Sequence, residues 1–208
     1  MRLHLVRHAR TEYNASGRLQ GWCDSPLTPD GLDQLRATAG HLSGVRLTAA
    51  WASPSGRTRT TAREILRHHA GLRLRTDEGL REYGFGELDG RPESELFSQV
   101  DPRAFFADVI NGRHPGLAGG EPAAAYLVRV VDVFRRIARA HPDGDVLVVS
   151  HGITLVTYLT HLGGTGVVPL GNSSVSTVEF TGNRAEVVEV GFLPPVSTGR
   201  TTADVSSS

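Results

Sequence analysis

The clearest absence in this sequence is lysine. All 22 residues counted as Lys or Arg are arginines, in a chain of 208 residues. This excludes a Schiff-base lysine, a catalytic lysine base and the lysine of a P-loop. Recognition of phosphate or carboxylate groups must therefore fall to arginine, whose planar guanidinium stays charged and binds such anions through two hydrogen bonds. A general compositional preference for arginine would give the same count, so this absence alone indicates no function.

Cysteine, net charge and long apolar runs are also scarce. The single Cys23 excludes an internal disulfide and a zinc site built from several cysteines, and it fits a reducing cytoplasm. Acidic residues balance the arginines to a formal net charge of +0 without a run of like charges, so we expect no nucleic-acid partner. No run of about 18 apolar residues occurs, and His and Arg interrupt the start of the chain, unlike a signal peptide. We therefore predict a cytoplasmic protein without a membrane partner.

Short apolar segments alternate with segments of helical periodicity. The apolar segments predict strands at 3–6, 49–52, 145–150, 175–180 and 185–190. The others predict a helix capped by Thr28, one capped by Ser53 or Ser55 that stops at Gly71, a short helix over 101–110, a longer one from about 122 to 140, and one after His151-Gly152. This alternation is typical of an α/β fold, a three-layer αβα sandwich around a mainly parallel sheet.

We expect a single catalytic domain over residues 2–192. The segment 84–121, interrupted by Gly and Pro, is predicted to be an insertion over the sheet. Thr181-Gly182-Asn183 predicts a hairpin turn between the last two strands, and an exposed edge strand there would allow two chains to pair as a homodimer. Residues 193–208 are rich in Ser and Thr and lack core residues, which predicts a flexible, non-catalytic tail.

Unusual polar residues follow three of the predicted strands. Arg7-His8 follows the first strand, Ser53 to Arg57 follows the second, and Ser150-His151 follows the strand at 145–150. Ligands of parallel sheets bind beyond the carboxyl ends of the strands, so we expect these side chains to share one rim. A histidine at a strand end is more often structural than catalytic. Arg57 is harder to explain, because the first turn of a helix disfavours a cation unless an anion is bound nearby.

Five segments of the chain carry motifs in a particular order. They are RHARTEYN at 7–14, RLQGWCDSPLTPDG at 18–31, SPSGRTRTTA at 53–62, LREYGFGELDG at 80–90 and VVSHGITL at 148–155. Together they resemble the successive motifs of the histidine phosphatase superfamily, which includes the cofactor-dependent phosphoglycerate mutases. The resemblance spans about residues 2 to 190, so it is more specific than a lone Arg-His pair. It implies a phosphoglycerate mutase-like fold and chemistry on a small phosphorylated substrate.

The resemblance also implies roles for individual residues. His8 matches the nucleophile, which attacks phosphorus and forms a phosphohistidine; a neutral imidazole suits this if a hydrogen bond fixes its other nitrogen. Arg7 and Arg57 match residues that bind the non-bridging phosphate oxygens, and His151 matches a further donor to the same group. Glu82 matches the acid that protonates the leaving oxygen and then activates water. Composition alone would make Glu82 a surface carboxylate.

Three further positions resemble the family less decisively. Asn14 matches a phosphate-contacting asparagine of many relatives, and a helix cap explains it equally well; we include it among the substrate-binding residues. Glu121 and Asn172 resemble recurring family positions, yet Pro122 stands where Ser is common, so neither is assigned a role.

The motifs also show departures and ambiguous positions. Ala9 replaces the Gly that usually follows the nucleophile, so the backbone there carries a Cβ and does not easily adopt positive φ. Arg10 stands where relatives commonly have Glu or Gln; it either faces solvent, which we favour, or selects a substrate with a second anionic group. Trp22 either touches substrate or packs against the protein, and Cys23, without a base partner in its motif, is expected to be a passive thiol.

The leading hypothesis is a phosphomonoesterase that acts through phospho-His8 without metal or cofactor. A phosphoglycerate mutase is the first alternative, weakened because mutases of this family usually carry a longer basic insertion, whereas residues 91–121 supply only three arginines. A second alternative is a non-catalytic relative that binds a phosphorylated ligand, for which Ala9 is the only hint. A His/His/Glu metal site is a third, but the two arginines would repel a cation.

Overall fold

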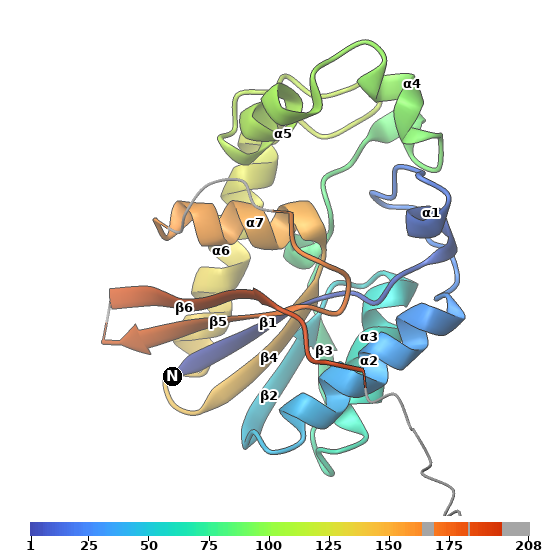
Figure 1. Cartoon of the computed structure of the whole chain (residues 1–208). Helices are drawn as coiled ribbons and strands as arrows, with labels where there is room; N and C mark the ends of the chain where they lie inside the picture. The colour runs from blue at the N-terminus through green and yellow to red at the C-terminus, as the bar shows by residue number, and fades with distance from the viewer. Residues whose placement is uncertain (164–168, 183, 197–208) are drawn as a thin grey trace, which may run out of the picture.

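The computed structural model describes residues 1–163, 169–182 and 184–196. Within these ranges six strands form one sheet in the order β3-β2-β4-β1-β5-β6 (Figure 1). The strands are β1 (Arg2–Arg7), β2 (Leu47–Ala52), β3 (Leu74–Thr76), β4 (Asp145–Ser150), β5 (Val175–Thr181) and β6 (Arg184–Phe192). The first four strands pair in parallel, and β5 and β6 join antiparallel. The mainly parallel sheet is therefore confirmed, with β3 as an additional short strand.

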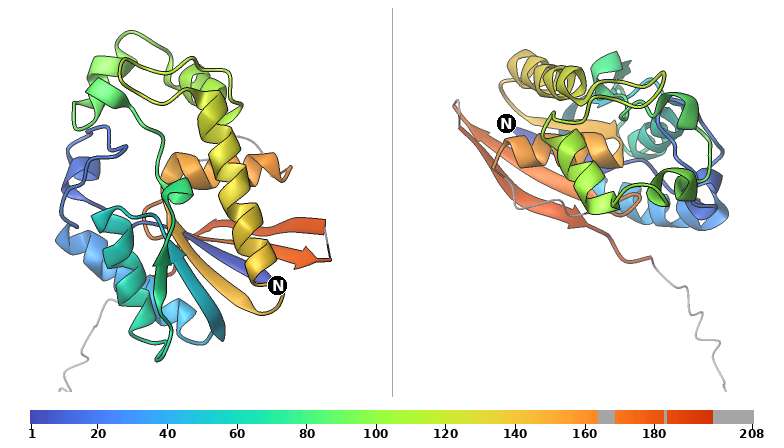
Figure 2. Two further views of the ribbon diagram at one scale, coloured as in Figure 1. Left: turned by 180° about the vertical axis from the view of Figure 1, so that it is seen from behind. Right: turned by 90° about the horizontal axis from the view of Figure 1, so that it is seen from above.

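Helices cover both faces of this sheet. The larger ones are α2 (Pro29–Leu42), α3 (Gly56–Leu66), α6 (Ala123–Ala140) and α7 (Gly152–His161), with shorter α1 (Glu12–Ala15), α4 (Glu93–Phe97) and α5 (Pro102–Ile110) and the 3₁₀ turns η1 (Glu78–Leu80) and η2 (Gly86–Leu88). Viewed from above, α2 and α6 lie on opposite sides of the sheet (Figure 2). This is the αβα sandwich expected from the sequence.

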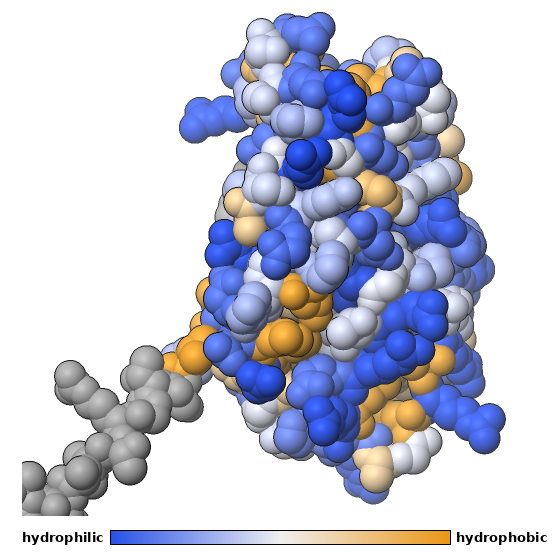
Figure 3. Space-filling view, turned by 90° about the vertical axis from the view of Figure 1, so that its right-hand side faces the viewer, coloured by the Kyte–Doolittle hydropathy of each residue, from blue (hydrophilic) through white to orange (hydrophobic). Residues whose placement is uncertain are grey.

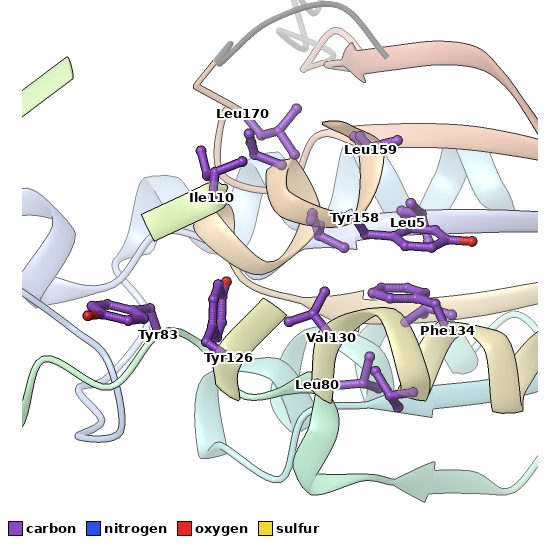
Figure 4. Packing of buried hydrophobic residues seen from close by; sticks show 14 of the residues in the cluster. Leu5, Leu80, Tyr83, Ile110, Tyr126, Val130, Phe134, Tyr158, Leu159 and Leu170 are labelled. Atoms are coloured by element: carbon purple, nitrogen blue, oxygen red, sulfur yellow. The ribbon is translucent and has the colours of Figure 1, made fainter. Parts of the chain in front are cut away.

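Each face has its own hydrophobic core, because alternate residues of a strand point to opposite sides. In β4, Val146 and Val148 join the cluster of α6 and α7, whereas Leu147 and Val149 join the cluster of α2 and α3. Phe134 of α6 stacks on Tyr158 of α7 with ring centroids 3.8 Å apart (Figure 4). The two cores hold β1 and β4 at the centre of the molecule, and both strands end at the candidate site.

The predicted start of α2 is confirmed, and α3 begins directly after Ser55, one of its two predicted cap residues, although that side chain makes no cap hydrogen bond. Thr28 Oγ1 accepts a hydrogen bond from Gly31 N (3.2 Å), with Pro29 in the first helical turn. Neither Ser53 nor Ser55 caps α3 through its side chain; the carboxylate of Asp24, distant in sequence, accepts from Gly56 N instead. The helix also ends at Leu66, and turns cover the residues before Gly71.

The segment 84–121, predicted as an insertion or cap over the sheet, lies beyond one end of the sheet. In Figure 1 its helix α5 lies above α7 and its helix α4 lies above α1, and α5 contacts α6 and α7. The segment thus covers the end of the sheet at which polar residues collect.

Met1 and the last described residues lie apart from that site. Residues 193–196 run along α2, where Gln34 Nε2 donates to Pro194 O (2.8 Å). The rest of the predicted tail, 197–208, and Asn183 of the predicted hairpin lie outside the described residues.

No helix in the described ranges is long and apolar enough to cross a membrane. The face in Figure 3 mixes hydrophilic and hydrophobic residues, with its hydrophobic side chains in several small patches.

Candidate active site

A cavity of about 210 Å³ lies where β1 and β4 end. Arg7, His8, Asn14 and Glu82 contribute to its wall. The backbone brings the strand ends together: His8 N donates to Ser150 O (2.9 Å), and Ser53 N donates to Val149 O (3.0 Å). The predicted common rim is therefore present. A larger hollow of about 600 Å³ near Met1 and Pro142 lies at the opposite end of these strands, away from the clustered His, Arg and Glu residues.

The geometry of His8 fixes which ring nitrogen can react. His8 Nδ1 lies 2.9 Å from Ala9 O. A carbonyl oxygen only accepts, so Nδ1 carries the proton and Nε2 of the neutral ring keeps a lone pair. Burial, reinforced by the charges of Arg57 and Arg7, holds the pKa of His8 well below its ordinary value of 6.5. Within the described residues Nε2 has no hydrogen-bond partner.

His151 lies directly beside His8, with ring centroids 5.3 Å apart. Arg57 Nη2 donates to His151 Nδ1 (3.0 Å), so Nε2 carries the proton and donates to Ser53 Oγ (2.8 Å). Burial and then the charge of Arg57 keep the pKa of His151 well below 6.5. Both ring nitrogens are engaged with protein groups, and His151 is not part of the cavity wall.

Arg57 is held away from the cavity by five acceptors. Besides His151, its guanidinium donates to Asp24 Oδ1 (2.7 Å) and to the carbonyl oxygens of Cys23 (2.7 Å), Gly21 (2.9 Å) and Gln20 (3.0 Å). The negative charge that offsets the unfavourable position of Arg57 in the first turn of α3 is therefore the carboxylate of Asp24, a residue of the protein itself. In this arrangement Arg57 fixes loop 20–24 at the mouth of the site.

Arg7 lines the cavity and carries a buried donor without a partner among the described residues. Its Nη1 donates to Leu170 O, but Nε is buried and has no partner within the described residues. Gly152, at the first position of α7, packs beside this group, and a backbone N–H at that position has no partner inside its helix. Buried donors are costly to leave unpaired, so this part of the cavity suits an anion with several acceptor oxygens.

Glu82 is a buried cavity residue and not a surface carboxylate. It is 7% exposed, and its Oε1 accepts from Tyr83 N (3.1 Å), Thr154 N (3.0 Å) and Thr154 Oγ1 (3.0 Å). Oε2 accepts from Ile153 N (3.0 Å). The carboxylate thus caps the N-terminus of α7 and lies beside the cavity that His8 also lines.

Asn14 takes part in a helix cap and also lines the cavity. Its Oδ1 accepts from Thr11 N (3.2 Å) in the cap of α1, while the residue also lines the cavity. Asn172, to which no role was assigned, donates through Nδ2 to Asn14 Oδ1 (3.1 Å) and to His8 O (3.0 Å). These contacts leave the amide nitrogen of Asn14 as the group that can donate into the cavity.

Comparison with known proteins places these residues in a family. The model of the histidine phosphatase superfamily (branch 1) matches residues 3–192, most of the chain. The chain belongs to the histidine phosphatase superfamily. It is accordingly an enzyme of the histidine phosphatase type.

Individual relatives of this superfamily carry both phosphatase and mutase names. The chain is 31% identical over 200 residues to a Hydrogenobacter thermophilus protein named as a phosphoserine phosphatase, covering 92% of this chain and 96% of the relative. It is 34% identical over 156 residues to a protein of Enterobacter sp. (strain 638) named as the phosphoglycerate mutase GpmB, covering 74% and 71% of the two chains.

Solved structures give the same picture of the fold. YhfR of Bacillus stearothermophilus is 30% identical with a TM-score of 0.80, covering 91% of this chain and 96% of that one. The α-ribazole phosphatase of Shigella flexneri is 25% identical with a TM-score of 0.79, covering 92% and 96%. The phosphoglycerate mutase-like fold is therefore confirmed.

Departures from the histidine phosphatase motifs are accommodated locally. Ala9 is fully buried, donates its N–H to Thr61 Oγ1 (3.0 Å) and does not adopt a positive φ. Arg10 is exposed, pairs with Asp30 (2.6 Å) and is not part of the cavity wall, which agrees with the favoured solvent position.

The two ambiguous residues of the mouth segment also lie off the cavity wall. Trp22 packs against Gly84 and donates Nε1 to Glu82 O (3.0 Å). Burial and the nearby Asp89 raise the pKa of the Cys23 thiol, as suits a passive residue.

A second residue that holds Glu82 in place, Arg129, was not predicted from the sequence. Arg129 of α6 donates to the carbonyl oxygens of Gly79 (3.0 Å), Arg81 (2.8 Å) and Glu82 (2.9 Å), and forms a bidentate pair with Glu121 (2.6 and 2.7 Å). The only available signal was the motif-like position of Glu121.

In the described ranges, no three His, Cys, Asp or Glu side chains are grouped as a metal site would require, so the His/His/Glu alternative lacks a ligand cluster there.

Proposed function

We propose that this protein is a metal-independent, cytoplasmic phosphomonoesterase that hydrolyses a small phosphorylated metabolite through a phosphohistidine on His8. The observation that carries the proposal is the hydrogen bond from His8 Nδ1 to Ala9 O, together with the lowered pKa of the ring. They leave a neutral imidazole with the Nε2 lone pair available, which is the form that attacks phosphorus.

In the first step Nε2 forms a bond to phosphorus while the bond from phosphorus to the alcohol oxygen breaks. The electron pair leaves with that oxygen, and Glu82 donates the proton that yields the alcohol. Oε2 of Glu82 suits this role because it accepts a single hydrogen bond, from Ile153 N, and retains a site for a proton.

In the second step Glu82, now a carboxylate, takes a proton from water as the water oxygen attacks phosphorus. The bond between Nε2 and phosphorus breaks, and its electron pair returns to the neutral imidazole of His8. Inorganic phosphate is released with Glu82 protonated again, so the cycle balances and needs no other reactant.

We propose that the transferred phosphoryl group binds Arg7 Nε, the Asn14 amide and Gly152 N. Preorganised donors of this kind stabilise the negative charge spread over the non-bridging oxygens. The family resemblance implies that Arg57 and His151 also bind the phosphoryl group. To do so they would exchange hydrogen bonds within the protein for hydrogen bonds to phosphate oxygens. The buried, unpartnered Nε of Arg57 is the group most readily available for that exchange.

The decisive experiment is hydrolysis of an aryl phosphate in excess chelator by the wild type and by His8→Ala. We expect chelator to leave the rate unchanged and the substitution to lower kcat by roughly 10⁴-fold or more. His68→Ala is the matched control, because His68 is exposed on the surface. Loss of activity with chelator, or activity that survives His8→Ala, would refute the mechanism.

Trapping separates the covalent route from direct attack by water. Brief incubation with a ³²P-labelled substrate should leave acid-labile, base-stable label on His8. Glu82→Gln should slow both appearance and decay of that label, by about 10²–10⁴-fold. Normal turnover without label would replace the phosphohistidine by direct attack.

A phosphoglycerate mutase remains the alternative, supported by relatives with that name. Assaying phosphate release and isomer exchange on the same phosphoglycerate separates the two functions. A non-catalytic relative would bind phosphate without either reaction.

A further inference from the structure

The cavity has a polar end and an apolar wall. The apolar part of the wall includes Phe85, Phe106 and Ile110 of the 84–121 segment, Val156 of α7, and Leu170. Figure 4 shows Ile110 and Leu170 side by side at the end of α7. These residues come from elements far apart in the sequence, and the fold gathers them around the space where the alcohol part of a bound ester would lie.

On the described part of the wall, the uncharged polar side chain left to bind the hydroxyl groups of an alcohol part is Gln20, which the protein already uses in part. Gln20 lies on the wall, but its Oε1 accepts from Thr11 Oγ1 (2.7 Å) and its Nε2 donates to Ser25 Oγ (3.0 Å). The hydroxyl groups of a sugar or glycerol would lose hydrogen bonds to water here and find few replacements among the described residues. Such unpaired burial disfavours binding.

On the described part of the wall, one charged side chain has no role in the proposed reaction. Apart from Arg7 and Glu82, the charged side chain on the wall is Arg18. It is exposed, donates Nη1 to Gly90 O (2.8 Å) and lies over the ring of Tyr13 at 5.8 Å. A carboxylate next to the phosphate would therefore meet one solvated cation at the rim, where ion pairs are weak.

We propose that the substrates are phosphate monoesters of small apolar alcohols, with an aromatic ring or a short branched chain packed against Phe106 and Ile110. This rests on the function proposed above, because it specifies the alcohol part of the same ester. The volume of about 210 Å³ limits the size, since pockets for drug-sized ligands hold about 300–1,000 Å³.

The test compares esters whose leaving groups are all primary alcohols. 2-Phenylethyl phosphate and glycerol 1-phosphate differ mainly in the polarity of the alcohol part, so their kcat/KM ratio reports recognition and not leaving-group ability. We expect the wild type to favour 2-phenylethyl phosphate by about 10- to 100-fold. 3-Phosphoglycerate, with its carboxylate, should be as poor as glycerol 1-phosphate.

Phe106→Asn should lower this preference about 10-fold or more, by losing apolar contact and adding a hydrogen-bonding amide. Phe97→Asn is the matched control, because Phe97 packs on Phe106 (ring centroids 5.5 Å) without lining the cavity. Val156→Thr provides a second change to the wall if Phe106→Asn does not fold, and it should shift the ratio in the same direction.

The outcomes separate this inference from the proposed function. Hydrolysis through His8 with equal or better use of glycerol 1-phosphate or 3-phosphoglycerate would overturn the apolar class and leave the phosphatase intact. A preference that depends on Arg18, lost in Arg18→Gln, would point instead to a second anionic group. If no ester releases phosphate, both the function and the substrate class are wrong.

Discussion

His8 and His151 owe their charge state to the guanidinium groups packed around them. Burial is the larger cause of the lowered pKa of each ring, and Arg57 adds to it in both cases. Two imidazolium ions 5.3 Å apart beside two arginines would repel strongly, so the neutral pair is the stable state. The same environment that suits His8 for attack on phosphorus therefore links the stability of the fold to pH.

This linkage predicts a loss of stability on mild acidification. Because the pKa of His8 is lower in the folded chain than its ordinary 6.5, the unfolded chain binds the proton first as pH falls. The free energy of unfolding should thus be constant above about pH 6.5 and decrease below it, by up to about 1.4 kcal/mol per pH unit for each such histidine. Urea unfolding between about pH 5 and 7 measures this slope.

Substitution isolates the contribution of His8 from that of other groups. His8→Asn should flatten the slope below pH 6.5, whereas His68→Asn at an exposed site should leave it as in the wild type. An unchanged slope in His8→Asn would mean that the folded protein does not hold this ring neutral.

The positions of site residues were predictable from the sequence only where a local pattern or motif contained them. The strand ends with Arg7, His8 and His151 followed from apolar patterning, and Glu82 followed from the resemblance. The partners of Arg57 did not, because Asp24 meets it across 33 positions of sequence and no local pattern reports that pairing.

Residues of α6, α7 and loop 20–24, all outside the segment that carries Glu82, hold this residue in place. Its side chain caps α7, and its backbone carbonyl accepts from Arg129 of α6 and from Trp22 of loop 20–24. Loop 20–24 is in turn fixed by Arg57 and by Asp89, which accepts from Gly21 N and Trp22 N (both 3.0 Å). The proposed acid is therefore positioned jointly by elements on both sides of the site.

Arg129→Met should consequently impair proton transfer to the leaving group. Loss of the donors to Gly79 O, Arg81 O and Glu82 O frees the loop, and we expect kcat for an alkyl phosphate to fall by about 10–100-fold. The loss should be smaller for an aryl phosphate with a good leaving group, because that oxygen needs less help from an acid. Equal losses on both esters would indicate a general structural defect instead.

Two controls accompany this measurement. Arg135→Met changes an exposed arginine of the same helix and should leave kcat unchanged. Glu121→Gln removes the charge that pairs with Arg129 but keeps its three bonds to carbonyl oxygens, so its effect should be milder than that of Arg129→Met.

At the level of elements, periodicity predicted the larger helices and strands well and the connecting segments poorly. β3 has three residues, too few for an alternating pattern to be recognised. The 84–121 segment was recognised as an insertion, but its position beyond the sheet depends on contacts of α5 with α6 and α7 that are non-local. Those contacts place Phe106 and Ile110 on the cavity wall, so they also determine the proposed substrate class.

The whole molecule carries no net charge, yet its site concentrates cations. Arg7 and Arg57 are buried and both lie close to His8 and His151, while several other arginines are paired with carboxylates on the surface. A net charge of +0 is thus compatible with a cavity that attracts an anion. Pairing of two chains through the edge strand β6, where Val188 and Val190 are exposed, stays a prediction.

An anion bound at this site should stabilise the entire fold. Inorganic phosphate would pair the buried Nε of Arg7 in the folded chain and has no such site in the unfolded chain. At 100 times its Kd, phosphate should raise the free energy of unfolding by about 2.7 kcal/mol, equivalent to roughly 5–10 °C in Tm for a chain of this size. Thermal unfolding in excess chelator, with phosphate titrated at constant ionic strength, measures the shift.

Matched arginine substitutions decide whether the shift arises at this cavity. Arg7→Met should abolish it while the protein still unfolds cooperatively, because the substitution removes the unpartnered donor and a buried charge together. Arg10→Met should keep the full shift, since Arg10 is exposed and paired with Asp30, off the cavity wall. A similar loss in both variants would show that phosphate acts on the general charge of the protein, and the buried donor of Arg7 would then need another explanation.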